Sequence, residues 1–111
     1  MEWAKLKEGE YPELIWLHAI PNGGQRNVVV ASKLKREGVK PGIWDLFLPS
    51  PRKGYHGLYI EMKFGKNKLT KSQEAFEAFA SRQVYKMVVA YSWHEAAEAI
   101  EKYLKLNGMG T

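Results

Sequence analysis

The chain has 111 residues, of which 45% are hydrophobic and 26% are charged, and its formal net charge is +5. This length supports one small domain with a single core. The absence of cysteine excludes disulfides and thiolate chemistry, and three scattered histidines argue against tetrahedral zinc. No run approaches the roughly 20 apolar residues that span a bilayer, and the charged first residues do not resemble a signal peptide, so we expect a cytoplasmic protein.

The first half of the chain predicts a helix, a strand and a second helix. Residues 1–9 predict a short helix, and residues 14–20 predict a strand. A turn follows at residues 21–24, where Asn and Gly accept positive φ. Residues 28–37 predict mostly a helix that ends at Gly38, although the three valines at its start favour a strand. The side chains expected on one face of the first strand are Leu14, Trp16, His18 and Ile20.

Two apolar runs, residues 42–48 and 58–64, flank a turn at residues 49–57 and predict a pair of strands. In the second run, Tyr59, Glu61 and Lys63 share one face, and the opposite, apolar face is expected in the core. A hairpin register can place Asp45 opposite Glu61. Asp45 is the only aspartate in the chain, in an otherwise apolar strand where a charge is costly unless it is paired or bound to metal. The apolar face comprises Leu58, Ile60, Met62 and Phe64.

Two carboxylates that converge from neighbouring strands form an oxygen-rich site suited to Mg²⁺ or Mn²⁺. Lys63 can then position a water molecule and offset negative charge in a transition state. The alternative for Glu61 and Lys63 is a surface ion pair.

The last part of the chain predicts helix, strand and helix. Thr70 and Gln73 have the spacing of a capping box that opens a helix. Residues 85–91 predict a buried strand, and Ser92 caps the last helix. The order of elements indicates an α/β domain with a central mixed four-stranded sheet flanked by helices. Core side chains are expected at Ala75, Phe76, Phe79 and Ala80 of the first helix and at Trp93, Ala96, Ala97, Ile100, Tyr103 and Leu104 of the second.

The positive charge is concentrated around the two acids. Residues 26–71 hold eleven Lys and Arg residues but only Glu37, Asp45 and Glu61 as acids, whereas the segments before and after them carry small negative balances. A basic field around two acids suits a phosphodiester substrate with a divalent metal. A solvated basic surface is the alternative.

The ordered set of Gly42-x-x-Asp45, a hairpin, Glu61-x-Lys63 and a helix that opens with Gln73 resembles the PD-(D/E)xK nuclease superfamily. Within it, the chain resembles the virus-type replication-repair nuclease (VRR-NUC) domain, in a stand-alone form of phage type. The resemblance covers roughly residues 11 to 105. Trp44 departs from the family pattern, which has proline there, and Val84 replaces a common glycine. The further blocks that carry the resemblance are residues 21–24 with Arg26, residues 38–42 and residues 69–73.

The resemblance implies a restriction-endonuclease-like fold over residues 1–111 and a metal-dependent DNA endonuclease. Asp45, Glu61 and the Met62 carbonyl would hold Mg²⁺ or Mn²⁺. Lys63 would position the attacking water and stabilise charge at the phosphate, and Gln73 would support Lys63. A third acid would come from the first helix at a position upstream of Met1, and Glu2 is the candidate to replace it. The family further implies a homodimer that acts on branched DNA such as Holliday junctions, in the host cytoplasm if the protein is phage-encoded.

The DNA itself would be contacted by polar and basic side chains around the acids. Two other functions stay open: a catalytically silent DNA-binding domain on the same fold, and a basic interaction module of a replication or repair complex. The predicted DNA contacts are Asn22, Arg26, Lys33, Arg36, Lys40, Arg52, Lys53, Lys66, Lys68 and Lys71.

Overall fold

The structure is a computed structural model that describes residues 1–21, 32–33 and 35–106. Within these residues, Ser32, Lys33, Lys35 and Arg36 are helical, and Gly38, with φ of 93°, follows that segment. None of the helices in the described part of the chain is long and apolar enough to cross a membrane. The elements are α1 (Glu2–Lys7), the 3-10 helix η1 (Pro12–Trp16), β1 (His18–Ala19), β2 (Leu46–Leu48), β3 (Leu58–Met62), α3 (Lys71–Arg82), β4 (Lys86–Ala90) and α4 (Trp93–Leu104).

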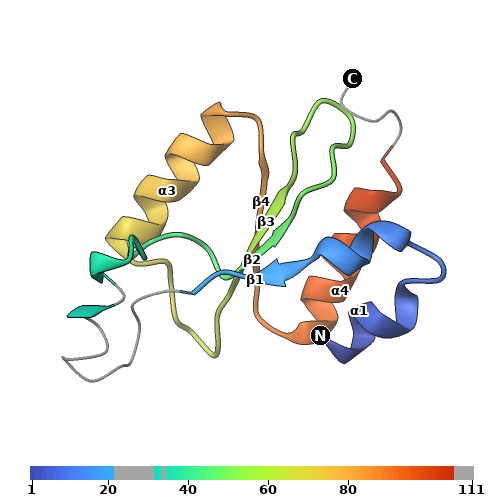
Figure 1. The fold of residues 1–111 in the computed structure, drawn as a ribbon, viewed down its shortest axis with the longest axis horizontal. Helices are drawn as coiled ribbons and strands as arrows, with labels where there is room; N and C mark the ends of the chain where they lie inside the picture. Colours follow the sequence, from blue (N-terminus) through green and yellow to red (C-terminus); the bar gives the residue numbers. More distant parts are fainter. Residues whose placement is uncertain (22–31, 34, 107–111) are drawn as a thin grey trace.

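The four strands form one mixed sheet in the order β1-β2-β3-β4. The first three strands pair antiparallel, and β4 pairs parallel with β3 after the chain has passed through α3. Figure 1 shows α3 on one side of the sheet and α1 and α4 on the other. The predicted α/β fold with a mixed four-stranded sheet is confirmed.

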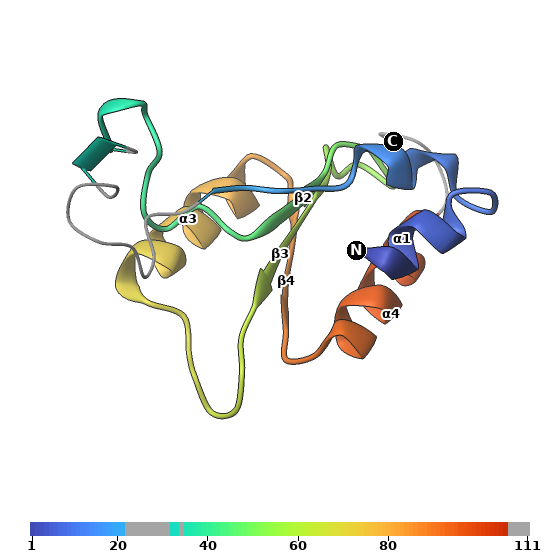
Figure 2. The same cartoon turned by 60° about the horizontal axis from the view of Figure 1, so that its bottom comes forward.

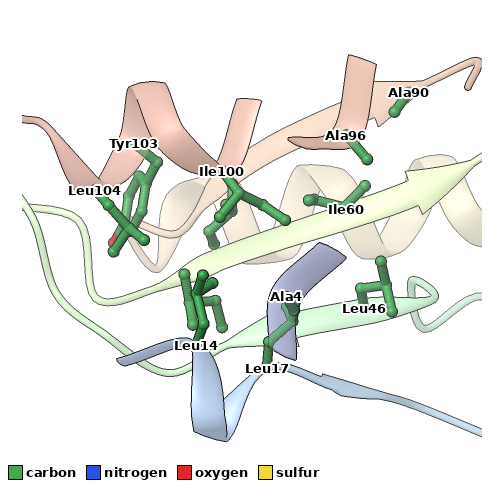
Figure 3. Packing of buried hydrophobic residues seen from close by; sticks show 12 residues of the cluster. Ala4, Leu14, Leu17, Leu46, Ile60, Ala90, Ala96, Ile100, Tyr103 and Leu104 are labelled. Atoms are coloured by element: carbon green, nitrogen blue, oxygen red, sulfur yellow. The ribbon is translucent and has the colours of Figure 1, made fainter. Parts of the chain in front are cut away.

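The main core lies between the sheet and the α1, η1 and α4 side (Figure 3). Leu46, Leu48, Leu58 and Ile60 alternate along β2 and β3 and are at most 4% exposed. Each such side chain contributes roughly 1.5–3 kcal/mol on burial. The residues that α4 contributes are Ala96, Ile100, Tyr103 and Leu104, as the helical spacing predicts.

The α3 side of the sheet is covered more thinly, by an aromatic cluster. The rings of Phe47 and Tyr59 stack with centroids 4.4 Å apart, and Phe76 of α3 meets Tyr59 edge-on at 5.0 Å. Burial raises the pKa of the Tyr59 hydroxyl, with a smaller contribution from Tyr85. The predicted core face of α3 is therefore only partly correct, because Ala80 is buried but Phe79 is 54% exposed and Ala75 is also exposed.

Three further expectations are wrong. Residues 14–20 are not one strand: Pro12 starts η1, and Leu14 and Leu17, three residues apart, are buried in place of Trp16. Phe64 is 70% exposed because it lies beyond the last residue of β3, before Gly65 turns the chain with φ of 59°. Trp93, at the first position of α4, is 51% exposed and does not join the core.

The loop at residues 49–57 is anchored from inside by Arg52. Its guanidinium donates to Ser50 Oγ at 2.8 Å and to the Leu104 carbonyl at 3.2 Å, and it pairs with Glu13. The Tyr103 hydroxyl donates to the Ser50 carbonyl at 2.6 Å, and burial raises its pKa to about 12. Arg52 is only 7% exposed, so the prediction that it contacts DNA is wrong: it is a structural residue that joins this loop to α4 and η1.

Candidate active site

The two predicted acids meet at one end of the β2–β3 hairpin. Leu46 pairs with Ile60, so Asp45, just before β2, lies opposite Glu61. The Asp45 backbone N–H donates to Glu61 Oε1 at 3.1 Å, and the Met62 N–H donates to Asp45 Oδ2 at 2.9 Å. Each carboxylate is thus held by a backbone amide of the other strand, as the hairpin register predicts for their positions.

Glu61 lies in an environment that disfavours its charge. It is 3% exposed, and burial, followed by the nearby Asp45 charge, raises the pKa of its carboxyl, while Lys63 acts in the opposite direction. The Lys63 ammonium lies 3.5 Å from Glu61 Oε2, and its side chain is 12% exposed. The predicted pairing of Glu61 with Lys63 is present, but it is mostly buried and is not a surface ion pair.

Gln73 joins the start of α3 to this acid pair. The capping box is complete, since Thr70 Oγ1 accepts from the Gln73 N–H at 3.2 Å and Gln73 Oε1 accepts from the Thr70 N–H at 2.9 Å. The side-chain nitrogen of Gln73, Nε2, donates to Glu61 Oε2 at 2.8 Å. Gln73 therefore caps the helix and orients Glu61 at the same time, and it shares this carboxylate oxygen with Lys63.

Trp44 is a site residue whose role the sequence did not reveal. Its indole is fully buried, and the indole N–H donates to the Gln73 carbonyl at 3.1 Å. Nearby, Gly42 has a φ of 94°, and a Cβ built on it would lie 2.6 Å from the Ser72 carbonyl oxygen. The segment that leads into β2 thus packs in direct contact with the first turn of α3. The only sequence signal was that Trp44 stands where the family pattern has proline.

The predicted third acid does not join the pair. Within residues 1–21, 32–33 and 35–106, no group of three or more His, Cys, Asp or Glu side chains is arranged to hold a metal ion. Glu2 instead lines a hollow of about 840 Å³ together with Trp3, Trp93 and His94. Glu2 therefore does not form a three-acid cluster with Asp45 and Glu61 among the described residues, and its role as a metal ligand stays a prediction.

The predicted DNA-contacting residues fall into three groups. Asn22 and Arg26 lie outside the described residues. Lys53 is exposed but lies in the loop at the end of the hairpin opposite to Asp45, and Arg52 is buried. Lys66 and Lys68 lie in the loop that projects between β3 and α3 (Figure 2). The exposed residues outside the 49–57 loop are Lys33, Arg36, Lys40, Lys66, Lys68 and Lys71.

Comparison with known proteins identifies the family. The family model of the VRR-NUC domain matches residues 1–93. A solved structure described as "VRR_NUC domain protein" superimposes with a TM-score of 0.70 and 31% sequence identity, over 88% of this chain and 77% of that one. A comparison with curated protein sequences gave no significant match. The matched residues include the whole hairpin and the start of α3, so this chain belongs to the VRR-NUC family of nuclease-type domains.

Proposed function

We propose that residues 1–111 form one metal-dependent DNA endonuclease domain that hydrolyses phosphodiester bonds. The observation that carries this proposal is the convergence of Asp45 and Glu61 at one end of the hairpin, with the Lys63 ammonium 3.5 Å from Glu61. Without a bound cation, two neighbouring carboxylates, one of them buried, raise the free energy of the folded protein. They suit a site that binds a cation.

The residues present fit a hard divalent cation such as Mg²⁺ or Mn²⁺. The donors are all oxygens: the two carboxylates and, in our proposal, the Met62 carbonyl between Glu61 and Lys63. Burial, followed by the nearby Asp45 charge, raises the pKa of the Glu61 carboxyl, and a bound cation would offset both effects by favouring the ionised form. When bound, the metal would supply Lewis-acid activation of water and charge neutralisation at the phosphate.

The chain's own residues have distinct roles in this proposal. A backbone amide of the neighbouring strand holds each of the Asp45 and Glu61 carboxylates in position. Lys63 would orient the attacking water and stabilise negative charge on the phosphate oxygens. Gln73 would keep Glu61 in a single orientation through its 2.8 Å hydrogen bond. The exposed lysines of the loop that follows Lys63 would hold the DNA backbone.

The finer parts of the proposal are a homodimer and a preference for branched DNA, including Holliday junctions. A domain with one site needs a second copy to nick two strands symmetrically, and a two-fold axis supplies it.

The test is cleavage of labelled four-way-junction, flap and linear duplex DNA with Mg²⁺ or Mn²⁺. Wild type is compared with Asp45→Ala and Lys63→Ala, and DNA binding is followed in the same samples. Lys105→Ala is the matched control, because this exposed lysine lies at the C-terminal end of α4 and is not among the predicted DNA contacts. We expect cutting to be lost in the two site variants and kept in the control. The ranking of the three DNAs tests the branched-DNA preference.

The second candidate function is a catalytically silent DNA-binding domain. The observation in its favour is that only two acids converge among the described residues, with Glu2 elsewhere. Tight DNA binding by the wild type with no cutting under either metal would support this function and would exclude the endonuclease.

A further inference from the structure

The hollow beside Asp45 has an exposed aromatic wall. It has a volume of about 530 Å³, and its lining includes Asp45, Met62, Trp93, Ile20 and Pro21. Apart from the Asp45 carboxylate, these side chains are apolar. The hollow next to Asp45 can therefore accommodate a flat, mostly apolar group of a ligand that Asp45 helps to bind.

Hydrogen bonds of the neighbouring residues hold the backbone at Trp93, which lines the edge of this hollow. The Ser92 hydroxyl accepts from the Glu95 N–H at 3.1 Å, and Glu95 Oε1 accepts from the Tyr91 N–H at 2.9 Å. These bonds fix the backbone on both sides of Trp93 at the start of α4. The indole is nevertheless 51% exposed, although its place in the helical pattern predicts a core residue. A rigid backbone with an uncovered indole is suited to stacking.

We propose that Trp93 stacks on an unpaired nucleobase of the nucleotide next to the scissile phosphate, and that the hollow beside Asp45 holds its sugar and base. This inference rests on the proposed nuclease function, since it takes Asp45 as the point where the phosphate is bound. It deepens that proposal by naming Trp93 as the residue that would recognise an unstacked nucleotide at the cleavage point, as at a fork or junction, in preference to continuous duplex.

The chemistry of the site favours a nucleotide over other apolar ligands. Nucleobases have an apolar face that stacks on an indole, and each carries a phosphate that the basic loop with Lys66 and Lys68 can attract. A base in intact duplex has both faces covered by its neighbours, so it cannot reach Trp93 without unstacking. Stacking on one aromatic residue changes affinity by roughly 5-fold to 150-fold.

The experiment measures binding to two DNAs of equal length, a forked duplex with 2-aminopurine at the unpaired branch position and a fully paired duplex with 2-aminopurine in the middle. Binding is measured in Ca²⁺, and the recovered DNA is checked for cutting. For Trp93→Ala, we expect affinity for the fork to fall about tenfold and affinity for the duplex to change less than about twofold. Quenching of the branch 2-aminopurine, present with wild type, should be lost.

Two further variants separate stacking from folding. Trp93→Phe keeps an aromatic face and should bind the fork within about threefold of wild type. Trp16→Ala removes an indole that is 68% exposed on η1, outside the hollow, and should change neither affinity. The sedimentation coefficient of Trp93→Ala should match that of wild type, because we propose that a nucleobase, and not a second copy of the chain, packs on Trp93.

Three outcomes would overturn the inference. Equal weakening of fork and duplex binding by Trp93→Ala would exclude base stacking, and so would unchanged binding to both. Dissociation of a wild-type dimer by this substitution would assign Trp93 to a subunit contact. A different result would contradict the nuclease proposal alone. In that case wild type would cut no DNA with Mg²⁺ or Mn²⁺, but its preference for the fork would still depend on Trp93.

Discussion

The indole N–H of Trp44 donates to the Gln73 carbonyl, and the Gln73 side-chain amide in turn donates to Glu61. Trp44, directly before the candidate metal ligand Asp45, is therefore linked through the start of α3 to the second candidate ligand, Glu61. Proline at this position would fix the backbone φ of the segment. Tryptophan cannot restrict φ in this way, but it ties the same segment to α3 by a buried hydrogen bond.

Trp44→Phe should lower the free energy of unfolding by about 2 kcal/mol, because a fully buried side chain loses volume and a hydrogen bond. It should also slow DNA cleavage more than it weakens DNA binding, since Gln73 loses its anchor. Urea denaturation and single-turnover cleavage at a temperature where the variant is folded measure both effects. Trp16→Phe, at a 68% exposed position, is the control. A folded variant that cleaves at the wild-type rate would limit Trp44 to a structural role.

Gln73→Glu separates the two roles of Gln73. Glutamate also completes a capping box, so the helix start is kept. The new carboxylate would, however, face Glu61 Oε2 where the amide now donates. We expect a loss of about 1–2 kcal/mol in unfolding free energy at neutral pH without metal. The double variant Glu61→Gln/Gln73→Glu exchanges donor and acceptor and should recover much of this loss. A coupling energy near zero in this cycle would mean that the hydrogen bond adds nothing to stability.

The raised pKa of Glu61 predicts a pH dependence of stability in the metal-free protein. The folded state holds this proton more tightly than the unfolded state, whose carboxyl has the ordinary value near 4.5. The unfolding free energy contributed by Glu61 is therefore greatest at acidic pH, falls as pH rises through the folded pKa, and stays low above it.

Asp45→Asn removes the second largest cause of this shift, after burial. In the presence of EDTA, it should stabilise the protein by about 1 kcal/mol at pH near 8 and by less at pH near 4, where Glu61 is protonated in both proteins. Urea denaturation at the two pH values is the measurement. A variant that is less stable than wild type at the higher pH would contradict the repulsion between the two acids.

Val84→Gly should stabilise the protein. Val84 has a φ of 63°, which is strained for a β-branched residue by about 1–2 kcal/mol. Its side chain is 43% exposed, so little burial is lost, and the greater freedom of glycine in the unfolded chain offsets part of the gain. We expect a net gain of about 0.5–1 kcal/mol in urea denaturation. Val84→Ala keeps the Cβ and should show no such gain, and equal effects of the two substitutions would exclude backbone strain as the cause.

The parts of the site that the sequence predicts correctly depend on short-range patterns. The opposition of Asp45 and Glu61 follows from a hairpin register, and the capping box of Thr70 and Gln73 follows from a spacing of three residues. The mixed sheet likewise follows from the order of strands and helices. Each of these is encoded by residues close together in the chain or by the sequence of elements.

The features of the site and fold that the sequence does not predict depend on contacts between residues far apart in the chain. Trp44 and Gln73 are 29 residues apart, and Arg52 and Leu104 are 52 apart, and no local pattern marks either hydrogen bond. Basic residues in a loop predict an exposed charge, whereas the three-dimensional fold buries Arg52. In α3, helical spacing predicts which residues share a face, but not how much of that face the sheet covers, as the exposed Phe79 demonstrates.

The crossed amide contacts of Asp45 and Glu61 also affect how the hairpin finds its alignment. If β2 slid along β3 by two residues, every side chain would remain on its own face and the apolar pattern would tolerate the error. Both amide-to-carboxylate hydrogen bonds would nevertheless be broken, and a charged group would be left in the sheet without its donor. The acids that disfavour the folded state through their mutual repulsion therefore discriminate against misaligned hairpins, and replacing them with apolar residues should allow strand pairings that the wild-type chain rejects.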